Sequence, residues 1–346
     1  MAMNGMVCIN IREMSGVVEA RQRVATVCEA QGFGAALSDK VAIIVTELVT
    51  NIVKHAGGGE LLIRPFNEAG VSAIEFLALD RGPGIMDIGI ILQDVNFPDG
   101  SPGKGLTAVR SLSSFFDIYS LPGKGTAILA RIDKESPVPG PGSPAPQESS
   151  RMKIGVVCLP LVPDEPCGDG WDVARLRDRT VILVVDGLGH GPEAAKVPRE
   201  AIRIFRKDPN GEPAEILRTL HAALRSTRGG VAAVAVIDED RGRVTYAGAG
   251  NISGRIITGS VTQKMVSLNG TLGDQIRKFQ EFSYPWDAEA LLIMHSDGLT
   301  GHWDLEDYPG LARKPPALIA GVLYRDQTRG RDDVTVLALK PAGVKT

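Results

Sequence analysis

The segment from Ser136 to Ser150 constrains the fold of this chain more than any other stretch. It reads SPVPGPGSPAPQESS, with five prolines, two glycines and no aliphatic side chain larger than valine. Because proline fixes φ and removes an amide donor, and small polar side chains bury little surface, this segment cannot build a core. A structureless loop of this length is uncommon inside one compact domain. We therefore expect an exposed linker over 136–151 that joins a domain over 1–135 to a second domain over 152–346.

Composition excludes several classes of protein. Both predicted domains are long enough to bury a core of their own. The net charge of -3 argues against nucleic acid as a direct partner, because phosphate backbones are bound by an excess of basic side chains. The four cysteines form no CxxC pair and no zinc spacing, which predicts a reduced, cytoplasmic protein. The chain shows no signal-peptide pattern and no apolar run of about eighteen residues, so we expect no membrane segment.

One predicted helix of the first domain carries polar residues at helical spacing. The sequence LSDKVAIIVTELVTNIVKHA predicts a helix over 37–56, with Ser38 as its N-cap and an apolar stripe along one side. Glu47, Asn51 and His55 are four residues apart and share another face. A carboxylate one turn from a carboxamide suits a magnesium and phosphate site, although this spacing taken alone is more often a solvated polar face. We interpret His55 as a helix-end histidine rather than a catalytic one.

Three glycine loops follow that helix. The first, DRGPGI, begins with Asp80 at the end of a predicted strand over 73–79. The second, GKGL over 103–106, opens a predicted helix over 107–116, whose N-terminal amides can hold phosphate. The third, GKGT over 123–126, predicts a hairpin turn. Each loop taken alone is consistent with an ordinary turn.

Taken together and in this order, these motifs resemble a known family. ELVTN, DRGPGI, GKGL and GT are similar to the nucleotide-binding boxes of the GHKL ATP-binding fold, an α/β sandwich. The short interval between the boxes and the absence of a phospho-acceptor dimerisation helix favour the RsbT-like switch-protein serine kinases. The resemblance covers nearly all of residues 5–133.

This resemblance implies roles for residues of the first domain. Asn51 would ligate the magnesium ion on ATP, Asp80 would accept from the adenine amino group, and Glu47 would polarise the attacking hydroxyl of a protein serine or threonine. The remaining residues implied to contact nucleotide or shape its lid are Gly82, Gly84, Gly103, Lys104, Gly105, Leu106 and Thr126.

Acidic residues at strand ends mark the second domain. A buried-strand run over 180–185 leads directly into Asp186, and a shorter run over 291–295 leads to Asp297. Asp169 falls in a predicted loop, GDGW, and Asp332 precedes the final predicted strand. A single aspartate at such a place is usually a turn former. Four of them make a binuclear magnesium or manganese centre plausible, and no His or Cys cluster competes for zinc.

These motifs also resemble a family. GDGW, VVDGLGHGPEAA, YAGAGN, NGTLG, HSDGL and DDVTVLAL are similar, in this order, to the SpoIIE, RsbU and RsbX branch of the PPM serine/threonine phosphatases, which implies an αββα sandwich. The implied ligands of two Mn²⁺ or Mg²⁺ ions are Asp169, Asp186, Asp297, Asp332 and the Gly187 carbonyl. We expect Asp333 to support these ligands. The sequence departs from the wider family in two places: Pro198 interrupts the helix after Asp186, and no arginine near Lys153 is an obvious counterpart of the phosphate clamp of the eukaryotic enzymes.

The combined expectation is an α+β protein of two domains that is a bifunctional partner-switching regulator. The first domain would phosphorylate, with ATP and Mg²⁺, a serine or threonine of a STAS-domain antagonist protein, and the second would remove the same mark. A stressosome-like scaffold is a further expected partner in anti-sigma-factor signalling. Two alternatives remain: the first domain is a nucleotide-dependent module that only binds its partner, or it is an ATP or ADP sensor for the phosphatase.

Overall fold

The computed structural model describes residues 5–68, 71–89, 104–134 and 152–343. The chain separates into two compact units. One contains residues 5–150 together with 313–325, and the other contains residues 1–4, 151–312 and 326–346. The predicted two-domain α+β architecture is therefore confirmed. The predicted linker over 136–151 lies outside the described residues, so the predicted domain boundaries stay predictions.

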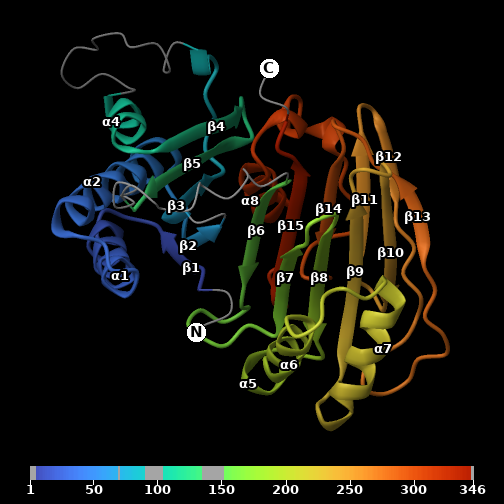
Figure 1. The fold of residues 1–346 in the computed structure, drawn as a ribbon. Helices are drawn as coiled ribbons and strands as arrows, with labels where there is room; N and C mark the ends of the chain where they lie inside the picture. Colours follow the sequence, from blue (N-terminus) through green and yellow to red (C-terminus); the bar gives the residue numbers. More distant parts are fainter. Residues whose placement is uncertain (1–4, 69–70, 90–103, 135–151, 344–346) are drawn as a thin grey trace, which may run out of the picture. The chain divides into compact units, whose positions relative to one another are not determined.

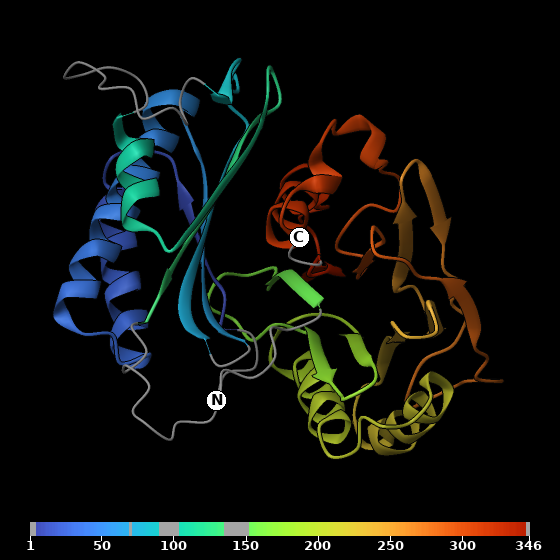
Figure 2. The ribbon, with the colours of Figure 1, turned by 45° about the horizontal axis from the view of Figure 1, so that its top comes forward.

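The first unit is built on one five-stranded sheet (Figure 1). Its strand order is β1-β2-β3-β5-β4, and every neighbouring pair is antiparallel. Helices α1, α2 and α4 lie along one face of that sheet (Figure 2). The bounds are β1 Val7–Ile11, α1 Gly16–Ala30, α2 Ala35–Asn51, β2 Gly59–Glu68, β3 Val71–Asp80, α4 Lys104–Leu112, β4 Phe115–Leu121 and β5 Gly125–Asp133.

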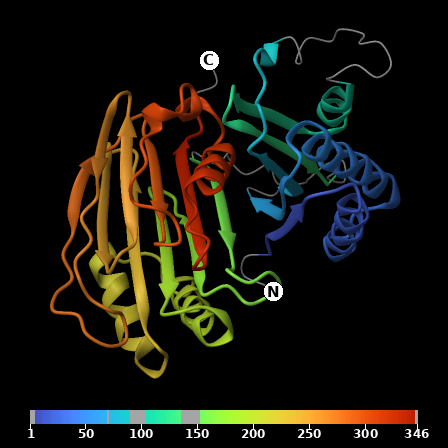
Figure 3. The ribbon, with the colours of Figure 1, turned by 180° about the vertical axis from the view of Figure 1, so that it is seen from behind.

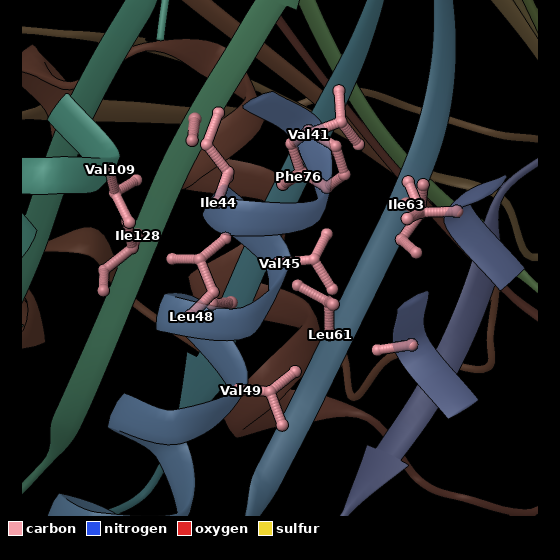
Figure 4. Close-up of a cluster of buried hydrophobic side chains, with 14 of the residues drawn as sticks. Val41, Ile44, Val45, Leu48, Val49, Leu61, Ile63, Phe76, Val109 and Ile128 are labelled. Carbon is pink, nitrogen blue, oxygen red and sulfur yellow. The ribbon is translucent and has the colours of Figure 1, made fainter. Parts of the chain in front are cut away.

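Helix α2 fixes the core of the first unit. Its apolar stripe faces the sheet and is fully buried at Val41, Ile44, Val45, Leu48 and Val49, against strand residues such as Leu61, Ile63, Phe76 and Ile128 (Figure 4). Burial of each such side chain contributes about 1.5–3 kcal/mol to folding. Since the stripe is anchored to the sheet, the polar residues of α2 are held at fixed positions along its side.

The ends of two predicted helices differ from the prediction. Ser38 does not cap α2; the cap is Gly34, and the Ser38 hydroxyl donates to the Gly34 carbonyl from within the first turn. The regular helix ends at Asn51 and continues as one π-helical turn, Ile52–Ala56, a feature common at functional sites. The helix predicted over 107–116 begins earlier and ends at Leu112, because Phe115 and Phe116 pair with strand β5 instead.

The second unit is a sandwich of two five-stranded sheets, seen from behind in Figure 3. Their orders are β13-β10-β9-β8-β7 and β12-β11-β14-β15-β6, and an apolar core formed by residues of both sheets lies between them. Helices α6 and α7 pack on the other face of the first sheet. The bounds of the strands are β6 Met152–Leu159, β7 Asp169–Arg175, β8 Thr180–Gly187, β9 Gly230–Asp238, β10 Arg243–Ala249, β11 Ser253–Thr258, β12 Val261–Lys264, β13 Phe282–Pro285, β14 Leu291–His295 and β15 Val334–Pro341.

The helices of the C-terminal sequence are α5 Gly191–Ala194, α6 Lys196–Phe205, α7 Pro213–Ala223 and α8 Pro316–Gln327. The predicted interruption near Pro198 takes the form of a break at Ala195, and Pro198 lies in the first turn of α6, where a proline is tolerated. The expected loop around Asp169 is wrong, because Asp169 begins strand β7. In the described residues no helix is long and apolar enough to cross a membrane.

Candidate active sites

Asp80 stands at the end of strand β3, beside two glycine loops. Its Oδ1 accepts hydrogen bonds from the backbone N–H groups of Gly82 (2.8 Å) and Thr126 (3.1 Å). Burial raises the pKa of the carboxyl, and these two N–H groups oppose that shift. Both bonds end on Oδ1, and together they fix the orientation of the carboxylate. The arrangement presents one carboxylate oxygen as a rigid acceptor.

Glu47, Asn51 and Gly105 come together in the structure, from two elements far apart in sequence. A β-carbon built on Gly105 would lie 2.5 Å from Glu47 Oε2 and 3.4 Å from Asn51 Oδ1. Only a glycine therefore fits at this place without moving the carboxylate. The predicted helix N-terminus at the second glycine loop thus lies directly against the polar face of α2. Gly103 lies outside the described residues, and only the backbone of Lys104 is described.

The other two glycine loops bring backbone close to backbone. Gly84 has a φ of 72°, and a β-carbon at this position would clash with the Leu121 carbonyl oxygen. A β-carbon on Gly82 would lie 2.7 Å from the β-carbon of Ala56, in the π-helical turn. Thr126 Oγ1 lies 2.9 Å from Ser120 Oγ, which orders the hairpin turn below Asp80. Leu106 is buried and belongs to the core of the unit.

One orphaned polar atom supports a nucleotide at this site. Asn51 Nδ2 is buried and has no hydrogen-bond partner in the described part of the chain. An unsatisfied buried donor costs about 1–3 kcal/mol, so such an atom usually bonds to water or to a ligand. The donor set here consists of a carboxamide, a carboxylate and helix N-terminal amides, which fits a hard cation and phosphate. The residues present therefore fit ATP with Mg²⁺.

In the second unit, two of the predicted ligands pair across neighbouring strands. Asp169 of β7 lies directly opposite Asp186 of β8 in the antiparallel ladder, so both carboxylates belong to one end of the same sheet. The Ser296 hydroxyl donates to Asp169 Oδ2 at 2.6 Å, and Ser296 Oγ accepts from Thr335 N at 2.9 Å. Since Ser296 follows β14 and Thr335 lies in β15, these bonds join Asp169 to the second sheet.

The remaining predicted ligands come from the other sheet. Asp297 follows β14, and its Oδ2 accepts from Asn251 Nδ2 at 2.8 Å. Asp332 precedes β15, and its Oδ1 accepts from the backbone N–H of Asp333 at 2.9 Å. The amide of Gly187 donates to the Gly168 carbonyl at 2.9 Å. Asp169, Asp186 and Gly187 therefore belong to one end of the first sheet, and Asp297 and Asp332 flank paired ends of β14 and β15 in the second.

Asp333 has a supporting place in this assembly. Its Oδ1 accepts from Leu161 N (2.6 Å) and its Oδ2 from Gly168 N (2.5 Å), and the side chain is buried. Both oxygens are therefore used to close the loop that leads into Asp169. This agrees with the expectation that Asp333 supports the ligands.

The electrostatics of this cluster favour a cation. Burial raises the pKa of Asp186, and so do the neighbouring carboxylates of Asp169, Asp297, Asp332 and Asp333. Burial likewise raises the pKa of Asp169. Within the described residues no three His, Cys, Asp or Glu side chains are arranged to hold a metal ion on their own. Magnesium-type ions, however, bind through one or two carboxylates and keep several waters, and the all-oxygen donor set fits them.

A cation–aromatic cluster behind Asp297 was missed by the sequence reasoning. The buried guanidinium of Arg255 lies 3.9 Å from the centre of the Trp303 ring and donates to the carbonyls of Trp303 (2.5 Å) and Gly301 (2.6 Å). Trp303 Nε1 in turn donates to His295 Nε2 at 3.4 Å. These contacts hold the loop that follows Asp297. Nothing in the sequence signals them, because Arg255 and Trp303 belong to segments 48 residues apart.

Comparisons with known proteins match each half of the chain to a different family. Residues 13–132 match the family model of the histidine kinase-like ATPase domain, and residues 177–341 match that of stage II sporulation protein E. The chain is 34% identical over 128 residues to the serine/threonine-protein kinase RsbT of Bacillus subtilis, which is 37% of this chain and 96% of that relative.

The second half has its own relatives. The chain is 24% identical over 177 residues to the phosphoserine phosphatase RsbX of Bacillus subtilis, covering 49% of this chain and 85% of that protein. A solved structure described as "The bacterial stressosome: a modular system that has been adapted to control secondary messenger signaling" is 28% identical, with a TM-score of 0.51. The match covers 55% of this chain and 99% of the chain in that structure.

Proposed function

We propose that this chain both adds a phosphate group to a partner protein and removes it. The chain belongs through its first domain to the family of the RsbT serine/threonine-protein kinase and through its second to the SpoIIE phosphatase family. The substrate is a serine or threonine of a STAS-domain antagonist protein. The kinase uses ATP with Mg²⁺, and the phosphatase uses two Mn²⁺ or Mg²⁺ ions. The observation that carries the proposal is the meeting of Glu47, Asn51 and Gly105, because a pure binding module does not need the carboxylate.

In the first domain, the residues divide the work of phosphoryl transfer. Asp80 Oδ2 accepts from the adenine amino group, and Asn51 would hold the magnesium ion, which neutralises phosphate charge when bound. The amides at the start of α4 hold the terminal phosphate against Glu47. Glu47 takes the proton from the substrate hydroxyl as its oxygen bonds to the γ-phosphorus and ADP leaves. Most of the rate comes from this positioning and charge neutralisation.

In the second domain, the metal ions would be held by four carboxylates and one backbone carbonyl: Asp169, Asp186, Asp297, Asp332 and the carbonyl of Gly187. When bound, the ions supply an activated water and neutralise phosphate charge. Ser296 and Asn251 orient two of these carboxylates through their hydrogen bonds. Asp333 closes the loop before Asp169. Each of these supporting contacts fixes a ligand before the ion arrives, which lowers the cost of binding it.

Fusion of the two activities has a physical rationale. A partner held by one domain experiences the other at an effective concentration set by the linker, in the millimolar range for a short flexible one. The Pro/Gly/Ser composition over 136–151 suits such a tether. The balance between the two activities then depends on ATP and on how the partner is bound, with a stressosome-like scaffold as the assembly where it meets the chain.

Comparison of Glu47→Gln with the wild type separates the kinase from a binding module or a nucleotide sensor. Glu47→Gln keeps the size of the side chain and removes the base, so nucleotide and partner binding should persist while phosphoryl transfer falls by about 10²–10⁴-fold. Calorimetry with ATP and a STAS protein measures binding, and γ-phosphate transfer measures activity. Unchanged transfer in Glu47→Gln would refute the assignment of the base. Absence of transfer in the wild type, with binding intact, would support the module or sensor.

A further inference from the structure

The turn between helix α7 and strand β9 carries an arginine, Arg228, next to the loop that follows Asp186. Its backbone is held there by hydrogen bonds. Leu188 N donates to the Gly229 carbonyl at 3.1 Å, and Gly187 pairs with Gly230 in the ladder between β8 and β9. Gly229 has a φ of 76°, a left-handed conformation that sets the direction of the turn. Arg228 is therefore attached to the predicted metal loop itself.

The guanidinium group lies over a glycine of that loop. A β-carbon built on Gly189 would lie 3.6 Å from Arg228 Nη1. The Gly189 carbonyl also borders the carboxylates, because a β-carbon on Gly168 would lie 3.1 Å from that oxygen and 2.7 Å from Asp333 Oδ2. Arg228 is exposed, so it can reach a ligand arriving from solvent. The pKa of Glu193 is lowered mainly by its bond with Lys196 and also by the charge of Arg228.

The charge of the cluster explains why a cation is needed at this rim. Five carboxylates surround the site: Asp169, Asp186, Asp297, Asp332 and Asp333. Two divalent ions would neutralise four of these five charges, and a phosphomonoester brings about two more negative charges. The substrate would therefore meet a net negative site unless the protein supplies a positive group. Arg228 already lies beside this loop and can supply the positive charge.

We propose that Arg228 binds the phosphate group of the phosphoserine or phosphothreonine substrate, through its planar fork of N–H donors. The assignment rests on the proposed phosphatase activity and adds a substrate-binding residue to it. Arg228 touches the substrate and not the metal ions, so it contributes to KM and to the affinity for the phosphate product. Its effect on kcat is small.

Steady-state kinetics with a phosphothreonine peptide and Mn²⁺ test this proposal on the full chain. Arg228→Ala should raise KM about 10-fold and raise the inhibition constant of inorganic phosphate by a similar factor, with kcat within about threefold of wild type. Arg228→Lys keeps the positive charge but loses the planar pair of N–H donors, so its KM should lie between those of the wild type and Arg228→Ala. Arg225→Ala, an exposed arginine three residues away, is the matched control and should behave as wild type.

The outcomes separate this proposal from the phosphatase assignment. If Arg228→Ala has the KM and phosphate inhibition of the wild type, Arg228 does not bind phosphate, even though the phosphatase stands. If the wild type hydrolyses nothing in a metal-dependent way, the proposed phosphatase fails. Calorimetric binding of the phosphopeptide to wild type and Arg228→Ala still tests Arg228 in that case. Equal affinities would overturn the proposal, and about 10-fold weaker binding by the variant would support it.

Discussion

Replacing Asp80 with asparagine should weaken ATP binding without unfolding the first domain. The structure divides the carboxylate into two functions, because Oδ1 accepts from Gly82 N and Thr126 N. Asparagine keeps an oxygen for these two bonds and places an amide NH₂ where Oδ2 would accept from adenine. Two donors would then face each other at the base.

The magnitude follows from that single lost contact. A hydrogen bond to a charged group is worth about 1.5–3 kcal/mol, and the partial exposure of Asp80 favours the lower value. We therefore expect the Kd for ATP to rise about 10- to 30-fold. The free energy of unfolding should fall by less than about 1 kcal/mol, since both structural bonds remain. An amide NH₂ can donate to the O6 of guanine, so the preference for ATP over GTP should decrease.

Calorimetric titration of wild type and Asp80→Asn with ATP and GTP, together with thermal melting, measures these quantities. The ratio of the ATP affinity to the GTP affinity is the informative number, because general damage to the domain would weaken the binding of both nucleotides equally. An unchanged ATP affinity, or an equal loss for both nucleotides, would show that Asp80 does not contact the base.

Three further predictions concern other parts of the protein. Arg64→Met should destabilise the first domain by about 3–5 kcal/mol, because it leaves Glu75 buried without the partner that now donates to it at 2.8 Å. In denaturant unfolding, Arg64→Met/Glu75→Leu should recover most of this loss. Equal losses of stability in the single and the double variant would contradict this. Burial lowers the pKa of His295 to about 4, so its contribution to stability is complete above its unfolded pKa near 6.5 and is lost as the pH falls towards 4. Between pH 7.5 and 5 the wild type should therefore lose about 2 kcal/mol more than His295→Gln, and parallel pH curves would refute the shift. Gly105→Ala places a methyl group 2.5 Å from Glu47 Oε2 and should reduce phosphoryl transfer more than ATP binding, and a variant with normal transfer would argue against the close approach.

Local sequence signals were sufficient for the elements that deliver the site residues. The continuous apolar run before Asp186 and the helical stripe of α2 are both clear in the sequence, and the loop that begins at Asp80 follows its strand as predicted. The sequence predicts a loop at Asp169 because GDGW has no strand pattern of its own. It becomes a strand only through pairing with Asp186, a contact that local propensity does not encode.

Other features depend on contacts between distant segments. Gly105 is a turn residue by sequence, and its approach to Glu47 results from packing of α4 beside α2. Arg228 reaches Gly189 because strands β8 and β9 pair at that end. Serine is a favoured N-cap residue, but the N-cap of α2 is Gly34, one turn before Ser38. Each difference comes from tertiary packing that overrides a local preference.

A time course of labelled γ-phosphate from ATP, with Mg²⁺ and Mn²⁺ and a STAS protein, tests the central claim most directly. Wild type, Glu47→Ala and Asp186→Asn are compared. One chain that writes and removes the same mark should leave stable label on the partner only in Asp186→Asn, and Glu47→Ala should leave none. If no variant labels the partner, while wild type removes phosphate from a STAS protein phosphorylated beforehand, the kinase half of the account is wrong.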